Sequence, residues 1–254
     1  MNNSFVDNLK RKTIITGHYG SGKTEFAISI ALYKRHTVYA KHSLHLRNSL
    51  HLNELGDRFD YPLAIIDFDL VNPYFRSQER RELLESNGIA VYGSAYDKTI
   101  TAELPALSAD VRAPLESDSC RVFIDAGGND AGALVLNQFS KYFKDDETEM
   151  LTVVNANRPD TSDISGILKH IAAIEEVTSL TVSGLVNNTH MLRETTAADI
   201  THGFGLCSKI CEITGKSLLC NCYPDGIVDP NKLKGFSGDL LPLGLYMRPT
   251  WLDK

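Results

Sequence analysis

Residues 17–24 read GHYGSGKT and match the phosphate-binding loop pattern G-x-x-x-x-G-K-[ST] at every fixed position. A short apolar run at 13–16 precedes the loop, and apolar residues recur at helical spacing over 25–32. A strand, a glycine-rich loop and a helix in this order form a phosphate site. The glycines let backbone N–H groups surround phosphate oxygens, and the helix N-terminus attracts negative charge. The sequence therefore predicts a nucleotide-binding protein.

The loop supplies most of the candidate nucleotide ligands. We expect contacts from Gly17, His18, Tyr19, Gly20, Ser21, Gly22, Lys23, Thr24 and Glu25. Lys23 is expected to reach the β- and γ-phosphates as a catalytic cation, and the Thr24 hydroxyl to bind Mg²⁺. The alternative is a glycine-rich turn before an ordinary helix, but a Lys-Thr pair at a buried helix start argues against it.

Length, charge and cysteine content restrict the class of protein. The chain has 254 residues, 43% of them hydrophobic, and a net charge of −6. This charge argues against broad electrostatic binding to nucleic acid or to an anionic membrane. We find no run near the roughly 18 apolar residues that span a bilayer, and no signal peptide. An odd number of cysteines without an export signal favours reduced thiols and a cytoplasmic location.

Apolar runs typical of strands alternate with helical patterns along the chain. The pattern predicts an α/β P-loop NTPase fold, three layers with a mostly parallel sheet, in a single nucleotide-binding domain over 1–254. The predicted strands are 13–16, 63–67, 89–92, 122–125, 151–155, 182–187 and 217–222. The clearest predicted helices are 162–177, capped by Thr161 or Ser162, and 196–214, ending at Gly215.

Residues 34–61 fit this alternation poorly. Leucines interleave there with basic residues and with histidines at 36, 42, 45 and 51. We interpret the segment as an irregular amphipathic stretch that forms a helical excursion packed on the domain edge. A docking or membrane-surface patch is one alternative. A histidine metal site is another, although no H-x-x-x-H pair supports it.

Two predicted strands end in carboxylates. Asp67 ends one strand, Asp69 follows it, and Asp125 ends another. Ligands of open parallel sheets bind at the carboxyl ends of the strands, so these side chains should face the nucleotide. Asp125 fits the Walker-B carboxylate that holds Mg²⁺, and Gly127 and Gly128 give the next loop freedom to sense a γ-phosphate. A helix cap or a plain turn is the alternative in each case.

Asn187 and Asn188 follow a third predicted strand at the same rim. An Asn amide carries a donor and an acceptor, which match the N6/N7 edge of adenine. We therefore expect one of the two to contact the base. A turn-forming Asn pair is the alternative.

In these motifs the chain resembles the ParA/MinD branch of P-loop ATPases, the CobQ/CobB/MinD/ParA nucleotide-binding domains. The matching segments are GHYGSGKT at 17–24, DFDLVNPYF at 67–75, IDAGG at 124–128 and LVNN at 185–188. The resemblance implies that Asp69 is catalytic and orients the attacking water. It also implies that Asp67, Asp125 and Thr24 hold Mg²⁺. Members of this branch form ATP-sandwiched dimers and act as switches on a partner protein.

His18 departs from that pattern. Many members carry a signature Lys at this position, which reaches the partner's nucleotide across the dimer. A neutral imidazole cannot supply this fixed charge. Either Arg76 or Arg158 replaces it, or hydrolysis is slow, or dimerisation differs.

The cysteines suggest one further interpretation. Cys207 and Cys211 lie four apart on a predicted helix, and Cys220 and Cys222 flank one residue of a predicted strand. Some relatives bind iron–sulfur clusters through C-x-x-C pairs, but this spacing is missing here. We expect Cys220 and Cys222 to point to opposite faces of the sheet. Buried structural thiols are therefore favoured over a metal or cluster site.

The sequence as a whole predicts a Mg·ATP-binding ATPase that hydrolyses ATP slowly and controls an unidentified protein partner, with a possible ATP-dependent homodimer. The alternative is an ATP-dependent metabolic or cofactor-maturation enzyme on the same scaffold: a ligase, a kinase or a metal-cluster carrier. Residues 99–107 are a candidate lining for its acceptor pocket. A P-loop retained only for stability is a third interpretation.

Overall fold

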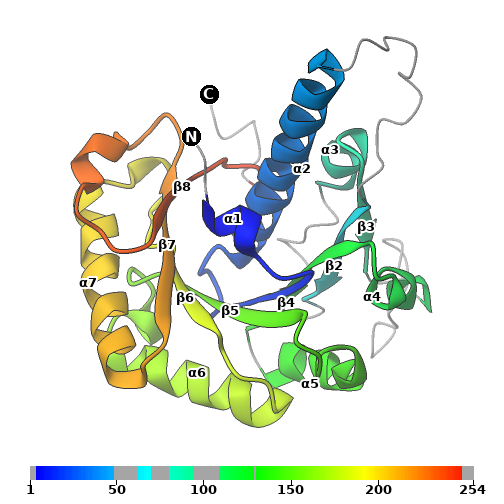
Figure 1. Ribbon diagram of the computed structural model, residues 1–254. Helices are drawn as coiled ribbons and strands as arrows, with labels where there is room; N and C mark the ends of the chain where they lie inside the picture. The colour runs from blue at the N-terminus through cyan, green and yellow to red at the C-terminus, as the bar shows by residue number, and fades with distance from the viewer. Residues whose placement is uncertain (1–3, 49–61, 70–79, 94–108, 129, 248–254) are drawn as a thin grey trace.

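The structure is a computed structural model. It describes residues 4–48, 62–69, 80–93, 109–128 and 130–247, with the backbone alone at 4, 39–48, 130, 131 and 133 (Figure 1).

A single parallel sheet of eight strands forms the middle layer. The strands are β1 Lys12–Thr16, β2 Leu63–Phe68, β3 Ile89–Tyr92, β4 Arg121–Ala126, β5 Thr148–Val154, β6 Gly184–Asn187, β7 Ser217–Pro224 and β8 Asp239–Leu243. Their order is β3-β2-β4-β1-β5-β6-β7-β8, and every neighbouring pair is parallel. The strand before the glycine-rich loop, β1, therefore lies near the centre of the sheet, between β4 and β5.

Helices cover both faces of the sheet, so the three-layer α/β/α prediction is confirmed (Figure 1). One face carries α1 Ser4–Asn8, α2 Lys23–Asn48 and α3 Arg81–Ser86. The other carries α4 Arg112–Glu116, α5 Asp130–Gln138, α6 Ile164–Thr178 and α7 Ala197–Thr214. Short 3-10 turns lie at Ala109–Val111, Ser140–Tyr142, Pro159–Thr161, Leu192–Glu194 and Pro230–Leu233. None of the helices in the described ranges combines the length and the hydropathy that a membrane-spanning segment needs.

The predicted strands all occur, and β8 is an additional strand that the sequence pattern did not indicate. Residues 34–48 of the predicted excursion are helical and continue α2 without a break. The reason is that Lys34 and Arg35, which look like surface residues, are buried. Lys34 donates to the backbone carbonyl of Val6 (3.4 Å), and Arg35 to that of Gly88. Residues 49–61 of the predicted excursion, including His51, lie outside the described ranges.

The ends of two helices test the capping predictions. Thr196 caps α7 in a reciprocal capping box with Asp199, and Gly215 ends it with φ 70°, as predicted. The cap of α6 is Asp163, whose carboxylate accepts the Gly166 N–H at 2.8 Å. The prediction of Thr161 or Ser162 was therefore wrong, because a closer carboxylate takes the same role.

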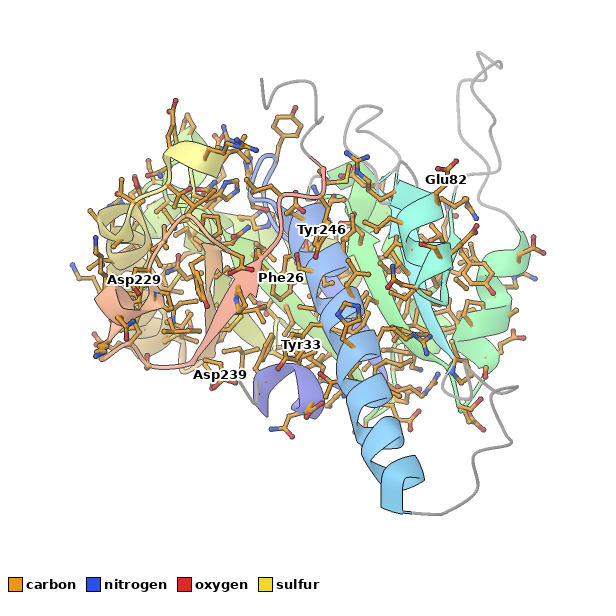
Figure 2. All side chains as sticks on the ribbon, turned by 90° about the horizontal axis from the view of Figure 1, so that it is seen from above. Phe26, Tyr33, Glu82, Asp229, Asp239 and Tyr246 are labelled. Atoms are coloured by element: carbon orange, nitrogen blue, oxygen red, sulfur yellow. The ribbon has the colours of Figure 1, made fainter. Side chains whose placement is uncertain are left out.

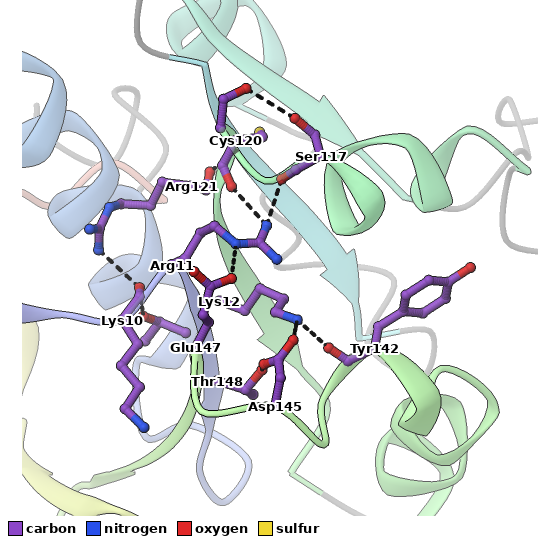
Figure 3. A network of polar contacts seen from close by, with 12 residues as sticks. Lys10, Arg11, Lys12, Ser117, Cys120, Arg121, Tyr142, Asp145, Glu147 and Thr148 are labelled. Atoms are coloured by element: carbon purple, nitrogen blue, oxygen red, sulfur yellow. Dashed lines mark hydrogen bonds and ion pairs between the residues drawn. The ribbon is translucent and has the colours of Figure 1, made fainter.

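A polar network fixes the amino end of β1 (Figure 3). The buried ammonium of Lys12 pairs with Asp145 and donates to the Tyr142 carbonyl. Arg11 forms an ion pair with Glu147 at 2.7 Å and also donates to the Ser117 carbonyl. This network anchors the strand at the end opposite to the glycine-rich loop.

The contact between α7 and the end of β6 is closely packed. Asn187 donates to the Ile200 carbonyl and to Asn221 Oδ1, both at 3.0 Å. Its own Oδ1 accepts from the N–H and the hydroxyl of Thr189. A Cβ on Gly203 of α7 would lie 2.2 Å from Asn187 Oδ1 and 2.0 Å from Thr189 Oγ1, so a residue without a side chain is needed there.

We expect Gly203→Ala to lower the free energy of unfolding by roughly 1–3 kcal/mol, because the added methyl overlaps this buried network. Gly205 lies on the same helix, and a Cβ there would meet nothing within 4 Å. Gly205→Ala should therefore stabilise the protein by up to about 1 kcal/mol through helix propensity. Urea unfolding of both variants checks the pair. Equal effects of the two substitutions would contradict the close contact at Gly203.

Candidate nucleotide site

The glycine-rich loop joins β1 to α2 at the carboxyl edge of the sheet. Ser21 N donates to the His18 carbonyl at 3.0 Å, and Phe26 N donates to the Gly22 carbonyl at 2.9 Å, which starts the helix at Lys23. The first-turn N–H groups of a helix have no acceptor within the helix, so they can receive an anion. Gly20 and Gly22 have φ of +75° and +80°, which favours glycine at both positions.

Three buried carboxylates gather beside this loop. Asp67 and Asp125 are register partners on β2 and β4, and Asp125 also pairs with Ile15 of β1. Asp69 follows β2, and its backbone N–H donates to Asp67 Oδ1 at 3.0 Å. The structure thus brings together the three acids that the sequence singled out.

Lys23 is the cation that faces this group. Its Nζ forms an ion pair with Asp69 Oδ2 at 2.9 Å, and both side chains are almost fully buried. Removal of one partner from a buried pair is strongly destabilising, because it leaves an uncompensated charge. Lys23 and Asp69 therefore stabilise each other in this arrangement.

Asp125 lies in a strongly unfavourable environment for a charge. Neither of its carboxylate oxygens makes a hydrogen bond within the described residues, and the side chain is fully buried. Burial and, next, the charge of Asp67 raise its pKa from 3.8 to about 8, whereas Lys23 and the side chain of Thr24 lower it. A buried carboxylate whose oxygens are uncommitted fits a Mg²⁺ ligand, since Mg²⁺ binds one or two carboxylates together with phosphates.

The loop after β4 touches the glycine-rich loop directly. A Cβ on Gly128 would lie 1.8 Å from the Gly17 carbonyl oxygen and 3.1 Å from His18 Cα. A Cβ on Gly132, in α5, would lie 2.4 Å from Gly127 Cα. Backbone therefore meets backbone along this path, so a movement of one loop must be accommodated by the other.

The carboxylate of Glu25 contacts the C-terminal part of the chain. It accepts the backbone N–H groups of Tyr246 at 2.5 Å and Met247 at 3.0 Å, next to the first turns of α2 (Figure 2). Burial raises its pKa from 4.5 to about 7, against the effect of these hydrogen bonds. The Glu25 side chain is thus committed to residues more than 200 positions away, and a nucleotide contact through its backbone N–H stays a prediction.

The remaining loop residues differ in exposure. Ser21 is buried, whereas Tyr19 is 64% exposed. His18 Nε2 lies 3.5 Å from Asp160 Oδ2, and its ring packs edge-on against His170. Of the two arginines predicted to replace the signature Lys, Arg158 lies at the loop and Arg76 lies outside the described residues.

Both asparagines lie at the carboxyl end of β6, as predicted, but their side chains have different partners. Asn187 is fully buried, and all four of its amide hydrogen-bonding positions bind the protein. This arrangement does not support Asn187 as a base contact, because its network would have to open first. The Asn188 amide donates to the Ser21 carbonyl of the glycine-rich loop at 2.9 Å.

Sequence reasoning missed Asn155, which ends the predicted strand 151–155 at the same rim. Its Nδ2 lies 3.3 Å from the Gly20 carbonyl of the loop, and the side chain is fully buried. A polar residue at the end of an apolar strand was the available signal, the same one that identified Asp67 and Asp125.

The cysteines require one correction. Cys220 and Cys222 belong to the same core cluster, on the α2 face of the sheet, and not to opposite faces. Side chains two residues apart in a strand share a face, so the expectation misapplied the strand period. Cys207 lies in the other cluster, and burial raises the pKa values of Cys207 and Cys220. Within the described residues, no three His, Cys, Asp or Glu side chains converge on one point where they could together hold a metal ion.

Comparisons with known proteins identify the fold. No protein-family model matches the sequence, and no curated protein matches it. Solved structures do match: chloroplast FtsY from Physcomitrella patens aligns with a TM-score of 0.50 and 16% identity over 82% of this chain. FtsY from Thermotoga maritima gives 0.49 with 17% identity over 82%, and FlhF complexed with GMPPNP and Mg²⁺ gives 0.46 with 16% identity over 85%.

This chain spans 56% of the plant FtsY structure, 60% of the Thermotoga structure and 70% of the FlhF structure. At these identities the likeness concerns the fold, which is that of the P-loop NTPases. The matches do not support the ParA/MinD branch in particular.

The pKa of Asp125 generates a prediction about stability. The folded protein keeps this proton up to about pH 8, whereas the unfolded chain loses it near 3.8. Unfolding therefore releases a proton in this window, and the contribution of Asp125 to the free energy of unfolding falls as pH rises through it. Asp125→Asn should remove this slope, so that its stability relative to the wild type increases toward pH 8. Urea unfolding between pH 5 and 8, with a chelator present, measures the effect.

Asp118→Asn is the matched control, because Asp118 is exposed. It should leave the pH dependence of stability unchanged. The part of the slope that Glu25 contributes remains in both proteins. A stability difference between Asp125→Asn and the wild type that does not change with pH would show that Asp125 is already ionised in the folded protein.

Proposed function

We propose that this chain binds a nucleoside triphosphate with Mg²⁺, hydrolyses it slowly, and uses the nucleotide states as a switch on a partner protein. The observation that carries the proposal is the buried Lys23 beside three buried carboxylates, directly after a glycine-rich loop at a helix start. The burial of this many charged groups is unfavourable in a core that binds no ligand. Perturbed groups of this kind concentrate at functional sites.

Different residues of the site would contact different parts of the Mg²⁺-bound nucleotide. The loop and the first turn of α2 would bind phosphate oxygens, and Lys23 would approach the β- and γ-phosphates. The Thr24 hydroxyl, Asp67 and Asp125 would hold Mg²⁺, which neutralises charge that develops on the phosphates. Asp125 would release its proton to do so, and this relieves the burial of a carboxyl without hydrogen bonds.

Asp69 has two roles in this proposal. Its carboxylate pairs with Lys23, so Lys23 must exchange Asp69 for phosphate when the nucleotide enters. Released from Lys23, Asp69 would orient the attacking water. The pair therefore links phosphate binding to the placement of the catalytic carboxylate.

The switch would operate through the contact between Gly128 and Gly17. A backbone loop that touches the phosphate loop this closely is displaced or held according to the phosphate beside it. The next element along the chain is α5, whose Leu134 is 57% exposed. A movement at the γ-phosphate would thus change the position of an exposed surface that a partner protein can bind.

A partner surface at this edge has further support. Tyr19 lies in the loop, Met191 and Leu192 follow β6, and Ile227 follows β7, and all four are exposed apolar side chains. They follow the carboxyl ends of β1, β6 and β7, and exposed apolar side chains at this edge would suit a docking site or a nucleotide-dependent homodimer. We propose a cytoplasmic location for this activity. The acceptor pocket predicted for the ligase, kinase or cluster-carrier alternative, at residues 99–107, lies outside the described ranges.

We propose ATP as the nucleotide, on the strength of the motif resemblance. One matched FlhF structure is complexed with GTP and Mg²⁺, so binding assays should compare both bases. Lys23→Ala should weaken binding of Mg·ATP by roughly 10- to 100-fold, the loss expected for a charge-assisted contact. Titration with fluorescent ATP and GTP analogues measures this.

Lys209→Ala, an exposed lysine on α7, is the control and should bind as the wild type does. Because Lys23→Ala leaves Asp69 unpaired, the double variant Lys23→Ala/Asp69→Asn tests the same contact without a buried charge. A folded double variant with wild-type affinity would overturn the phosphate site.

Asp69→Asn should slow hydrolysis by about 100-fold or more, since an amide cannot orient and activate water as a carboxylate does. Nucleotide affinity should be kept or increased, because Lys23 loses its competing anion. Steady-state turnover and equilibrium binding, measured on the same preparation, separate the two effects. An equal fall in rate and affinity would place Asp69 in ground-state binding instead.

A further inference from the structure

We propose that Asn155, Arg158 and Asn188 are positioning residues that hold the glycine-rich loop in its phosphate-binding conformation, an inference that rests on the proposed function. The three residues come from the segments that follow β5 and β6, the two strands next to β1 on one side. Each donates a hydrogen bond to a carbonyl of the loop.

The Gly20 carbonyl receives two of these bonds. Arg158 Nε donates to it at 3.0 Å, and Asn155 Nδ2 at 3.3 Å. The same peptide group carries the Ser21 N–H, which donates to the His18 carbonyl and closes the turn. The outside of this turn is therefore fixed by Asn155 and Arg158.

The Ser21 carbonyl receives the third bond, from Asn188 Nδ2 at 2.9 Å. The C=O and N–H of one trans peptide group point in opposite directions. A Ser21 carbonyl held by Asn188 therefore directs the Gly22 N–H to the other side, toward the phosphates that the loop would surround. Rotation of this peptide would turn a donor away from the anion and replace it with a carbonyl oxygen.

The loop glycines are packed against these side chains. A Cβ on Gly22 would lie 2.5 Å from Asn188 Nδ2 and 2.9 Å from His190 Nε2. A Cβ on Gly20 would lie 2.8 Å from Arg158 Nε. Positive φ favours glycine at both positions. At Gly22 the buried Asn188 amide also leaves no room for a Cβ, whereas at Gly20 the exposed Arg158 side chain would have to move.

The two amides are themselves held in place. Asn155 Oδ1 accepts from Asn157 N at 3.0 Å and from His190 N at 3.3 Å. Asn188 N donates to the Val154 carbonyl at 2.8 Å, which continues the pairing of β5 with β6. Because the sheet fixes both donors, the loop needs little ordering when an anion binds, and this favours affinity.

Asn188 could contact the base or support the phosphate-binding loop, and the two roles predict different effects on binding. A base contact would act on ATP and leave a base-free polyphosphate unaffected, whereas a support of the loop acts on both. We would measure binding of Mg·ATP, Mg·GTP and Mg·tripolyphosphate by competition with a fluorescent nucleotide. Asn188→Leu keeps a similar volume and removes the donor, and exposed Asn137→Leu is the control.

We expect Asn188→Leu to weaken all of these ligands by a similar factor, about 10- to 100-fold, as the Ser21 carbonyl loses its partner. Arg158→Met should weaken them all less strongly, because Asn155 still serves the Gly20 carbonyl, and Arg158→Lys should recover part of the loss. Arg158 is exposed, so its variants test the proposal even if Asn188→Leu does not fold.

A loss confined to ATP, with tripolyphosphate binding unchanged, would overturn the proposal and make Asn188 a base contact. Wild-type affinity for all three ligands in Arg158→Met would overturn the proposal for Arg158. Wild-type affinity in a folded Asn188→Leu would overturn it for Asn188. A wild-type protein that binds none of these ligands would instead contradict the proposed function, so the two failures are distinguishable.

Discussion

The ammonium group of Lys23 is the interaction on which the site depends. Three carboxylates lie buried at the carboxyl ends of β2 and β4, and Lys23 pairs directly with one of them at 2.9 Å. Without this cation, the burial of Asp67, Asp69 and Asp125 in one place would oppose folding. The same group is the expected ligand of phosphate, so the protein uses one charge for stability and for binding. Ligands that supply Mg²⁺ should therefore stabilise the fold, because they add the positive charge that the cluster lacks.

Local patterns were enough to predict the sheet and most of its elements. Strands such as Leu63–Phe68 are buried, mostly apolar runs, and the end of α7 at Gly215 is read from the local sequence. The failures involve partners distant in the sequence. Lys34 and Arg35 resemble surface residues, yet they bind carbonyls on α1 and before β3, which lets α2 continue to Asn48. No periodicity in the sequence carries that information.

The candidate site likewise contains residues that the sequence predicts and residues whose roles depend on distant contacts. Its charged residues, Lys23, Asp69 and Asp125, follow from the loop motif and from strand ends, and the structure brings them together. The roles of its amides do not follow. Asn188 and Ser21 are 167 residues apart, and only their contact shows that a residue typical of base recognition supports the loop here. A type of side chain identifies what it can bind, whereas its neighbours decide what it does bind.

The charges near the loop also bear on position 18, where the resemblance to ParA/MinD-type ATPases led us to expect a lysine and this chain has His18. Arg158 lies against the outer side of the loop at Gly20, where its Nε is committed to a carbonyl. His18, at the signature position, lies near Asp160 and packs against His170, whose pKa burial lowers to about 4. A neutral His170 cannot assist a cation at His18, and Asp160 partly offsets any charge there. Asp160 and His170 thus add no positive charge beside position 18, and this observation supports the proposal of slow hydrolysis.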